Sequence, residues 1–120
     1  MFLLKIIIAG SRNFRKYSLL KEKLEIILSN LNEDEIEIIS GGAPGADRLG
    51  EKFAYEKCYN LTIFPCRWDL YGLKAGPYRN LEMAKYADAL VAFHDGSSKG
   101  TISMINLAKK HNLKIRIIKI

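Results

Sequence analysis

Five short apolar runs alternate with segments of helical periodicity along this chain of 120 residues. The strand-like runs cover residues 3–9, 35–39, 61–65, 88–93 and 113–119, and the helical segments cover about 17–30, 45–58, 77–87 and 100–111. Such alternation is typical of parallel strands joined by right-handed crossovers. The sequence therefore predicts a single α/β domain over residues 1–120, with a Rossmann-like three-layer α/β/α architecture and a five-stranded, mainly parallel sheet.

The strand-like runs differ in a way that predicts their order. Residues 3–8 and 89–93 are almost continuously apolar, which is typical of central strands buried on both faces. Lys114, Arg116 and Lys119 interrupt the last run, as expected for an exposed edge. These features predict the order 3-2-1-4-5. In sheets of this kind ligands bind at the carboxyl ends of the strands where the winding reverses, here between the loops after Ala9 and Phe93.

The expected helices each carry an apolar face toward the sheet. The residues on these faces are Leu20, Leu24, Ile27, Leu28 and Leu31 in the first helix, Ala46, Leu49, Phe53 and Ala54 in the second, and Ile102, Ile105 and Ala108 in the last. With 48% hydrophobic residues, a core of this size needs neither disulfides nor a structural metal.

The composition indicates the cellular compartment and the class of partner that we expect. Cys58 and Cys66 have no C-x-x-C spacing, so we expect free thiols in a reducing compartment and no metal site. Lys5 interrupts the first apolar run, which favours a buried strand over a signal peptide, and no apolar run reaches the roughly 20 residues of a membrane helix. We expect a cytoplasmic protein that does not enter a membrane. The net charge of +6 favours anionic partners.

Two loops follow the first two strands and have the composition of anion-binding turns. The first contains Gly10, Ser11 and Arg12, which offer close backbone approach, a hydroxyl and a planar guanidinium. A glycine cluster follows the second strand, and its candidate ligand-binding residues are Gly41, Gly42, Ala43, Gly45, Ala46 and Asp47. A strand that turns through glycines into a helix is expected to present unpaired backbone N–H groups to a phosphate. The cluster matches neither a Walker A loop nor the Gly-x-Gly-x-x-Gly fingerprint, and Asp47 suits either ribose hydroxyls or the helix start.

Two further loops are expected at the same edge. The third contributes Trp68, Gly76, Arg79 and Asn80. Gly76-Pro77 predicts a helix whose first turn begins at the proline. Trp68 either stacks on a base or lies in the core. The fourth contributes His94, Asp95, Ser97, Lys99, Gly100 and Thr101. His94 lies beside Asp95 in the sequence, and its two alternative roles are a structural hydrogen bond and acid–base chemistry.

Three cations stand at helix starts, where the dipole disfavours positive charge. They are Arg48, Arg79 and Lys99. A cation in the first turn is unfavourable by itself, so three of them indicate that one anionic ligand compensates their charge.

The motifs together resemble the YspA-like (YpsA-related) branch of the SLOG superfamily, which is named for the DNA-processing protein Smf/DprA and the enzyme Lonely Guy. The resemblance covers nearly the whole chain and rests on Gly10-Ser11-Arg12-x-Phe14, Gly41-Gly42-Ala43-x-Gly45-Ala46-Asp47-Arg48-Leu49, Trp68, Ala75-Gly76-Pro77-x-Arg79-Asn80-x-x-Met83 and Ser97-x-Lys99-Gly100-Thr101. It implies a Rossmann-like domain that binds nucleotides or nucleotide-derived ligands, some related to ADP-ribose. Lonely Guy enzymes carry a Glu four residues after the glycine that matches Gly100, where this chain has Met104.

Three functions therefore stay open at this point, besides a purely structural interpretation in which the glycine loops only make tight crossovers. The first is a sensor or sequestering domain for a nucleotide or ADP-ribose-like ligand, which requires no cofactor. The second is an N-glycoside hydrolase or another nucleotide-processing enzyme, with Asp47, Arg79 and Asp95 as candidate catalytic residues. The third, favoured less, is a single-stranded DNA-binding module of the DprA kind. A homo-oligomer is compatible with each of them.

Overall fold

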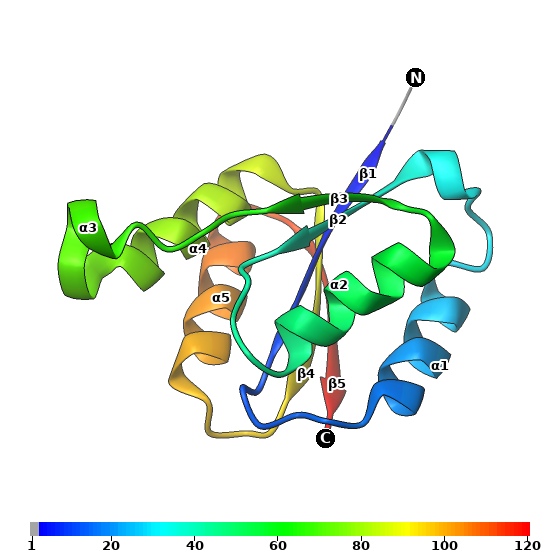
Figure 1. Cartoon of the computed structure of the whole chain (residues 1–120), viewed down its shortest axis with the longest axis horizontal. Helices are drawn as coiled ribbons and strands as arrows, with labels where there is room; N and C mark the ends of the chain where they lie inside the picture. Colours follow the sequence, from blue (N-terminus) through cyan, green and yellow to red (C-terminus); the bar gives the residue numbers. More distant parts are fainter. Residues whose placement is uncertain (1–2) are drawn as a thin grey trace.

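A computed structural model describes residues 3–120 and confirms the predicted α/β fold. Its five strands form one sheet in the order 3-2-1-4-5, and all four pairings are parallel (Figure 1). The strands are β1 (Leu4–Gly10), β2 (Ile36–Ser40), β3 (Asn60–Ile63), β4 (Ala89–His94) and β5 (Lys114–Lys119). The long helices are α1 (Tyr17–Ile27), α2 (Ala46–Lys57), α4 (Ala75–Tyr86) and α5 (Lys99–Lys110), and the short ones are η1 (Glu33–Glu35), α3 (Trp68–Tyr71) and η2 (Gly72–Lys74).

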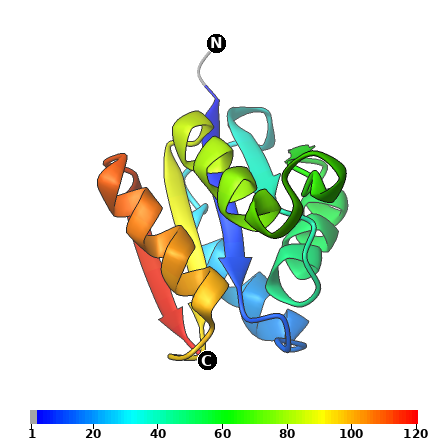
Figure 2. The ribbon, with the colours of Figure 1, turned by 90° about the vertical axis from the view of Figure 1, so that its left-hand side faces the viewer.

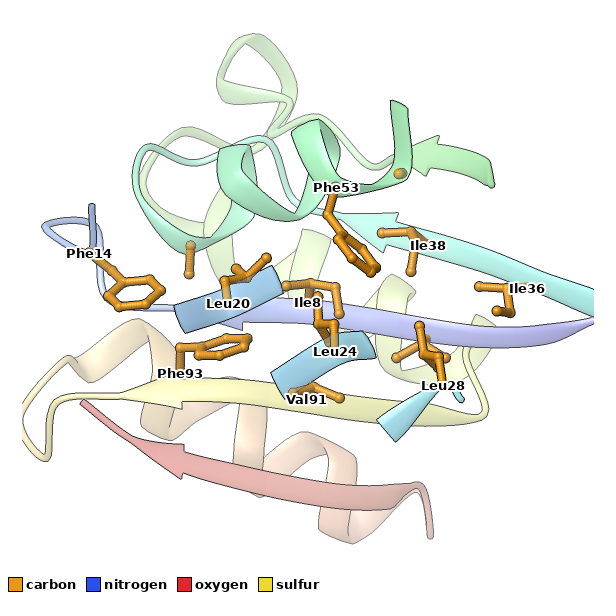
Figure 3. Close-up of a cluster of buried hydrophobic side chains, with 13 residues drawn as sticks. Ile8, Phe14, Leu20, Leu24, Leu28, Ile36, Ile38, Phe53, Val91 and Phe93 are labelled. Carbon is orange, nitrogen blue, oxygen red and sulfur yellow. The ribbon is translucent and has the colours of Figure 1, made fainter. Parts of the chain in front are cut away.

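The core consists of two apolar layers, one on each face of the sheet. Ile6 and Ile8 of β1 point to the face covered by α1 and α2, where they pack with Leu24 and Phe53 (Figure 3). Ile7 points to the opposite face, which α4 and α5 cover side by side (Figure 2). This alternation makes β1 apolar at every position that is buried between two helical layers. Within the described residues, no helix is long and apolar enough to cross a membrane.

The structure corrects the predicted face of the last helix. Ile105 and Ala108 are buried as expected, but Ile102 is exposed, and Thr101 and Met104 complete the buried stripe. Residues three apart rotate by about 300° around a helix, so a strict three-residue repeat drifts off one face. The i, i+3, i+4, i+7 pattern from Thr101 follows the true face.

The segment between β3 and β4 also differs from the expectation. Trp68–Tyr71 forms a helix of its own that the periodicity did not indicate, and Figure 1 shows it projecting from the body of the domain. Helix α4 begins at Ala75, so the expectation that it starts at the proline was wrong. Pro77 lies within the first turn, where its missing N–H would have no helical partner.

Glycines allow the loops after β1 and β2 to touch. Gly45 has a φ of +83°, and a Cβ built on it would lie 2.2 Å from the carbonyl oxygen of Ser11. The same oxygen accepts a hydrogen bond from the N–H of Ala46 at 3.2 Å. On the other side, a Cβ on Gly10 would lie 2.3 Å from the carbonyl oxygen of Phe93 in β4. The start of α2 is thereby held against the carboxyl ends of the two neighbouring central strands.

Candidate functional site

Two adjoining clefts open at the carboxyl edge of the sheet, where the sequence predicts the site. The outer cleft has a volume of about 580 Å³ and the inner one about 300 Å³. They share the lining residues Arg12, Ala43, Arg79, Asn80, Lys99 and Gly100. Loops that follow β1, β2 and β4 therefore converge with the start of α4 on one concave surface.

Four cationic side chains line the outer cleft, each from a different part of the chain. Arg12 follows β1, Arg48 lies in the first turn of α2, Arg79 lies in α4, and Lys99 begins α5. No Asp or Glu occurs among the described residues that line this cleft. Arg48 has one acidic partner outside the lining, the carboxylate of Glu51 at 3.2 Å. The three cations that the sequence places at helix starts do lie in one cleft, although Arg79 is in the second turn of its helix.

The same cleft also has an apolar part. It consists of Ile63, the last residue of β3, and Pro65, which follows that strand, together with Pro77 and Trp68. Trp68 is 60% exposed, so it lies at the surface of the cleft and not in the core. Sequence analysis missed Ile63, Pro65, Cys66, Pro77 and Ser103 as lining residues. Position alone could have indicated the first two, because they leave the carboxyl end of a strand in a parallel sheet.

The inner cleft lies deeper, against the end of β1. The predicted residues Gly10, Ser11, Asp47 and Thr101 line it in addition to the shared ones. Its lining also includes Ala9, Asn13, Met83, Ser98 and Met104, which sequence analysis did not select. Met104 stands where Lonely Guy enzymes carry a glutamate, so the inner cleft has an apolar side chain at this position.

Asp47 is the acidic residue of the inner cleft. Its residue exposure is only 7%, and burial raises the pKa of its carboxyl group to about 6, although the N–H of Ala43 and the nearby Arg79 guanidinium act in the opposite direction. The N–H of Ala43 donates to Oδ2 of Asp47 at 3.3 Å. Asp47 therefore gains or loses a proton near pH 6, and it also holds the glycine loop.

The glycine loop is closed by its own hydrogen bonds, which differs from the expectation of unpaired N–H groups. The N–H of Gly42 donates to Oγ of Ser40 at 3.0 Å, and that hydroxyl donates to Oε2 of the buried Glu51 at 2.6 Å. The N–H of Ala43 has the Asp47 partner described above. Cationic side chains, more than these loop amides, are therefore what the clefts offer to an anion.

Arg79 connects the glycine loop to α4. Its guanidinium donates hydrogen bonds to the carbonyl oxygen of Gly41 and, at 2.8 Å, to Oδ1 of Asn80. A Cβ on Gly41 would lie 2.7 Å from the guanidinium, so glycine is what permits the close approach. Gly76, at the start of α4, also lines the outer cleft as predicted.

Five predicted residues do not line either cleft: Gly45, Ala46, His94, Asp95 and Ser97. Gly45 and Ala46 lie behind the site, against the Ser11 carbonyl. Asp95 accepts N–H donors from Ser97 and Ser98, each at 2.9 Å, and these bonds hold the pKa of its carboxyl group well below the usual range. Nδ1 of His94 accepts the N–H of Gly96 at 3.4 Å. The fourth loop is thus shaped by Asp95 and His94, while Lys99, Gly100 and Thr101 face the clefts.

Comparisons with known proteins agree with this architecture. Residues 4–71 match the YspA, cpYpsA-related SLOG family. The gene 61 protein of Mycobacterium phage D29 is 29% identical over 117 residues, which cover 92% of this chain and 93% of that protein.

Two solved structures of DNA processing protein A share the fold. The protein from Streptococcus pneumoniae superposes with a TM-score of 0.74 at 17% identity, and the one from Helicobacter pylori, studied for its single-stranded DNA binding mode, with 0.72 at 19%. Both superpositions cover 97% of this chain, which spans 50% and 65% of those two chains, respectively. Because the family match extends over more than half of the 120 residues, this chain belongs to the YspA, cpYpsA-related SLOG family.

Proposed function

We propose that this domain binds a phosphate-bearing nucleotide or a nucleotide-derived ligand such as ADP-ribose in the two adjoining clefts, as a sensor or sequestering domain. The observation that carries the proposal is the set of four cations on the outer cleft: Arg12, Arg48, Arg79 and Lys99. A guanidinium pairs with phosphate through two parallel hydrogen bonds, and several such groups around one cleft favour a multiply charged anion.

The remaining lining suits the other parts of such a ligand. Trp68, Ile63 and Pro65 offer an apolar surface on which a base stacks, and Asp47 and Ser11 offer polar groups for ribose hydroxyls in the inner cleft. The first N–H groups of α5, at Lys99 and Gly100, add the positive end of a helix dipole.

A thermal-shift screen followed by calorimetry tests the proposal. ADP-ribose, AMP, NAD and inorganic pyrophosphate are compared at equal ionic strength, because a ligand at about 100 times its Kd adds about 2.7 kcal/mol of stability. Arg12→Gln is expected to weaken binding about tenfold or more, since it removes charge-assisted hydrogen bonds. Arg116→Gln, an exposed arginine on β5, is the matched control. Absence of a shift with every compound, or equal losses in both variants, would contradict the proposal.

A second candidate function is hydrolysis of an N-glycosidic bond. The buried carboxyl group of Asp47, with a pKa of about 6, favours it because a group that titrates near neutrality serves as a general acid or base. Incubation with nucleoside monophosphates, NAD and ADP-ribose, with release of the base followed by chromatography, tests this function. Turnover that is lost in Asp47→Asn, while ligand binding is kept, would identify an enzyme.

Single-stranded DNA binding is a third candidate. Trp68 lines the outer cleft with the four cations, and the exposed Tyr78, which contacts Tyr71, lines a neighbouring hollow together with Lys99. Aromatic rings beside positive charge are the usual platform for unpaired bases. The DNA processing protein A of Helicobacter pylori, which shares the fold, binds single-stranded DNA. This function predicts affinity for an oligonucleotide that falls steeply as salt increases.

A further inference from the structure

An apolar groove runs along the outer surface of α5, beside α4 and next to the ligand clefts. It has a volume of about 690 Å³, and its apolar lining, here called the floor, consists of Pro77, Tyr78, Leu81, Ile102 and Leu107. Figure 2 shows the two helices lying side by side on this face of the sheet. Ile102, which the sequence pattern assigns to the core, instead lies 39% exposed in this groove.

Exposed apolar side chains also occur on α3 and η2, and Tyr71 of α3 contacts Tyr78, which lines the groove. Leu73 is 95% exposed and Leu70 60%, while Tyr71 and Tyr78 are 43% and 45% exposed. Contiguous apolar surface of this kind, bordered by polar groups, marks contact sites for other macromolecules in soluble proteins. The rings of Tyr71 and Tyr78 lie 4.5 Å apart between centroids, so this pair connects α3 to the groove.

The charged residues around the groove are all lysines. Lys74 and Lys99 lie at one end and Lys110 lies at the other, and no Asp or Glu is among the described residues that line it. The two ends are separated by the whole of α5, whose 12 residues span roughly 18 Å. The groove thus matches an occupant about three helical turns long that carries negative charge at both ends.

We propose that this groove is a docking site for an acidic amphipathic helix of a partner protein. Such helices place apolar side chains at i, i+3 or i+4, and i+7 into a hydrophobic groove, while charges at the rim select the partner. Lys99, Pro77 and Ser103 line both this groove and the outer ligand cleft. A bound helix would therefore end at the mouth of the cleft.

Two other occupants fit less well. A second copy that is related by twofold symmetry would bring the same three lysines face to face, because such an interface pairs a surface with itself. A nucleic acid strand fits less well, because Tyr78 is the only aromatic side chain among the described residues that line the groove, and unpaired bases need aromatic platforms rather than the aliphatic Leu81 and Ile102. An acidic amphipathic segment matches both the apolar floor of the groove and the lysines at its two ends.

Fluorescence anisotropy with designed peptides tests the proposal. The probes are two labelled helical peptides of about 12 residues with the same leucine face, one with glutamates and the other with lysines at both ends. The acidic peptide is expected to bind and the basic one to bind at least about tenfold more weakly. Ile102→Glu is expected to weaken the acidic peptide about tenfold or more, and Lys110→Glu severalfold.

Lys109→Glu is the matched control, because Lys109 is exposed in the same last turn of α5 but does not line the groove. Equal losses for Lys109→Glu and Lys110→Glu, or equal affinity for both peptides, would overturn the proposal. A dimer seen by light scattering and dissociated by Ile102→Glu would assign the groove to a second copy instead. Competition by single-stranded oligothymidylate that depends on Ile102 would assign it to nucleic acid. These outcomes do not depend on whether the clefts bind a nucleotide.

Discussion

The guanidinium of Arg79 in α4 donates a hydrogen bond to the carbonyl oxygen of Gly41, which lies in the loop after β2. This contact joins two segments that are 38 residues apart and lies on the boundary between the outer and inner clefts. Arg79 therefore shapes the glycine loop and at the same time adds positive charge to both clefts.

Replacing Arg79 is expected to affect both stability and ligand binding. Arg79→Ala removes a charged donor from the Gly41 carbonyl, which is expected to lower the free energy of unfolding by about 1.5–3 kcal/mol. It is also expected to weaken binding of a phosphate-bearing ligand. Urea unfolding and calorimetry measure the two effects, with Lys85→Ala, an exposed lysine of the same helix, as the control. Unchanged stability would show that the contact with Gly41 contributes little.

The buried carboxyl group of Asp47 predicts a particular dependence of stability on pH. Its pKa is about 6 in the folded chain against 3.8 as the ordinary value, so between these values the folded chain binds more protons than the unfolded chain. Its contribution to stability therefore falls as pH rises from about 4 to about 6, by up to about 3 kcal/mol.

Urea unfolding at a series of pH values tests this prediction by comparing the wild type with Asp47→Asn. The variant is expected to lose this slope and to be the more stable of the two above pH 6. Asp34→Asn, at an exposed position in η1, is expected to leave the slope in place. The effect of burial would be refuted if the stability of the wild type, relative to that of Asp47→Asn, rose between about pH 4 and about pH 6.

Two glycines of the site region are expected to respond oppositely to alanine. Gly45→Ala requires a residue with a side chain at a φ of +83° and places a Cβ against the Ser11 carbonyl, so a loss of more than about 2 kcal/mol is expected. Gly100 lies in α5 with nothing within 4 Å of its Cβ position, so Gly100→Ala is expected to add up to about 1 kcal/mol. Thermal unfolding of both variants measures the difference, and similar effects in both would contradict it.

The single tryptophan supplies a direct probe of the outer cleft. Trp68 is 60% exposed and lines this cleft, so a base that stacks on it is expected to quench its emission or shift it to shorter wavelength. Titration with ADP-ribose measures the change, and Arg12→Gln is expected to move the midpoint to higher concentration. Binding heat without any change in emission would exclude stacking on Trp68.

Much of the fold follows from the sequence because parallel strands buried on both faces carry strong patterns. The apolar runs of β1 and β4 and the lysines of β5 suffice to predict the strand order, which the structure confirms. The convergence of the four loops follows from that order, since the carboxyl ends of parallel strands share one edge.

The rest depends on tertiary contacts that have no local signal. The four residues of α3 are too few for a helical period to be visible, and they carry exposed apolar side chains. Ser40 and Asp47 satisfy loop amides that glycine-rich composition alone predicts to be unpaired. Asp95 belongs to one of the four predicted loops, but its carboxylate accepts hydrogen bonds from the backbone N–H groups of Ser97 and Ser98. The sequence alone does not distinguish this arrangement from one in which the carboxylate faces the cleft.

Gly10 illustrates why mutational sensitivity and ligand contact need to be separated in this domain. The carbonyl oxygen of Phe93 would lie 2.3 Å from a Cβ at this position, so any side chain here disturbs the pairing of β1 with β4. A saturation screen that scores only the amount of folded protein should therefore reject every substitution at position 10. For Arg12, exposed two residues later, the same screen should tolerate many replacements, and only a selection that requires a bound ligand should reveal its importance.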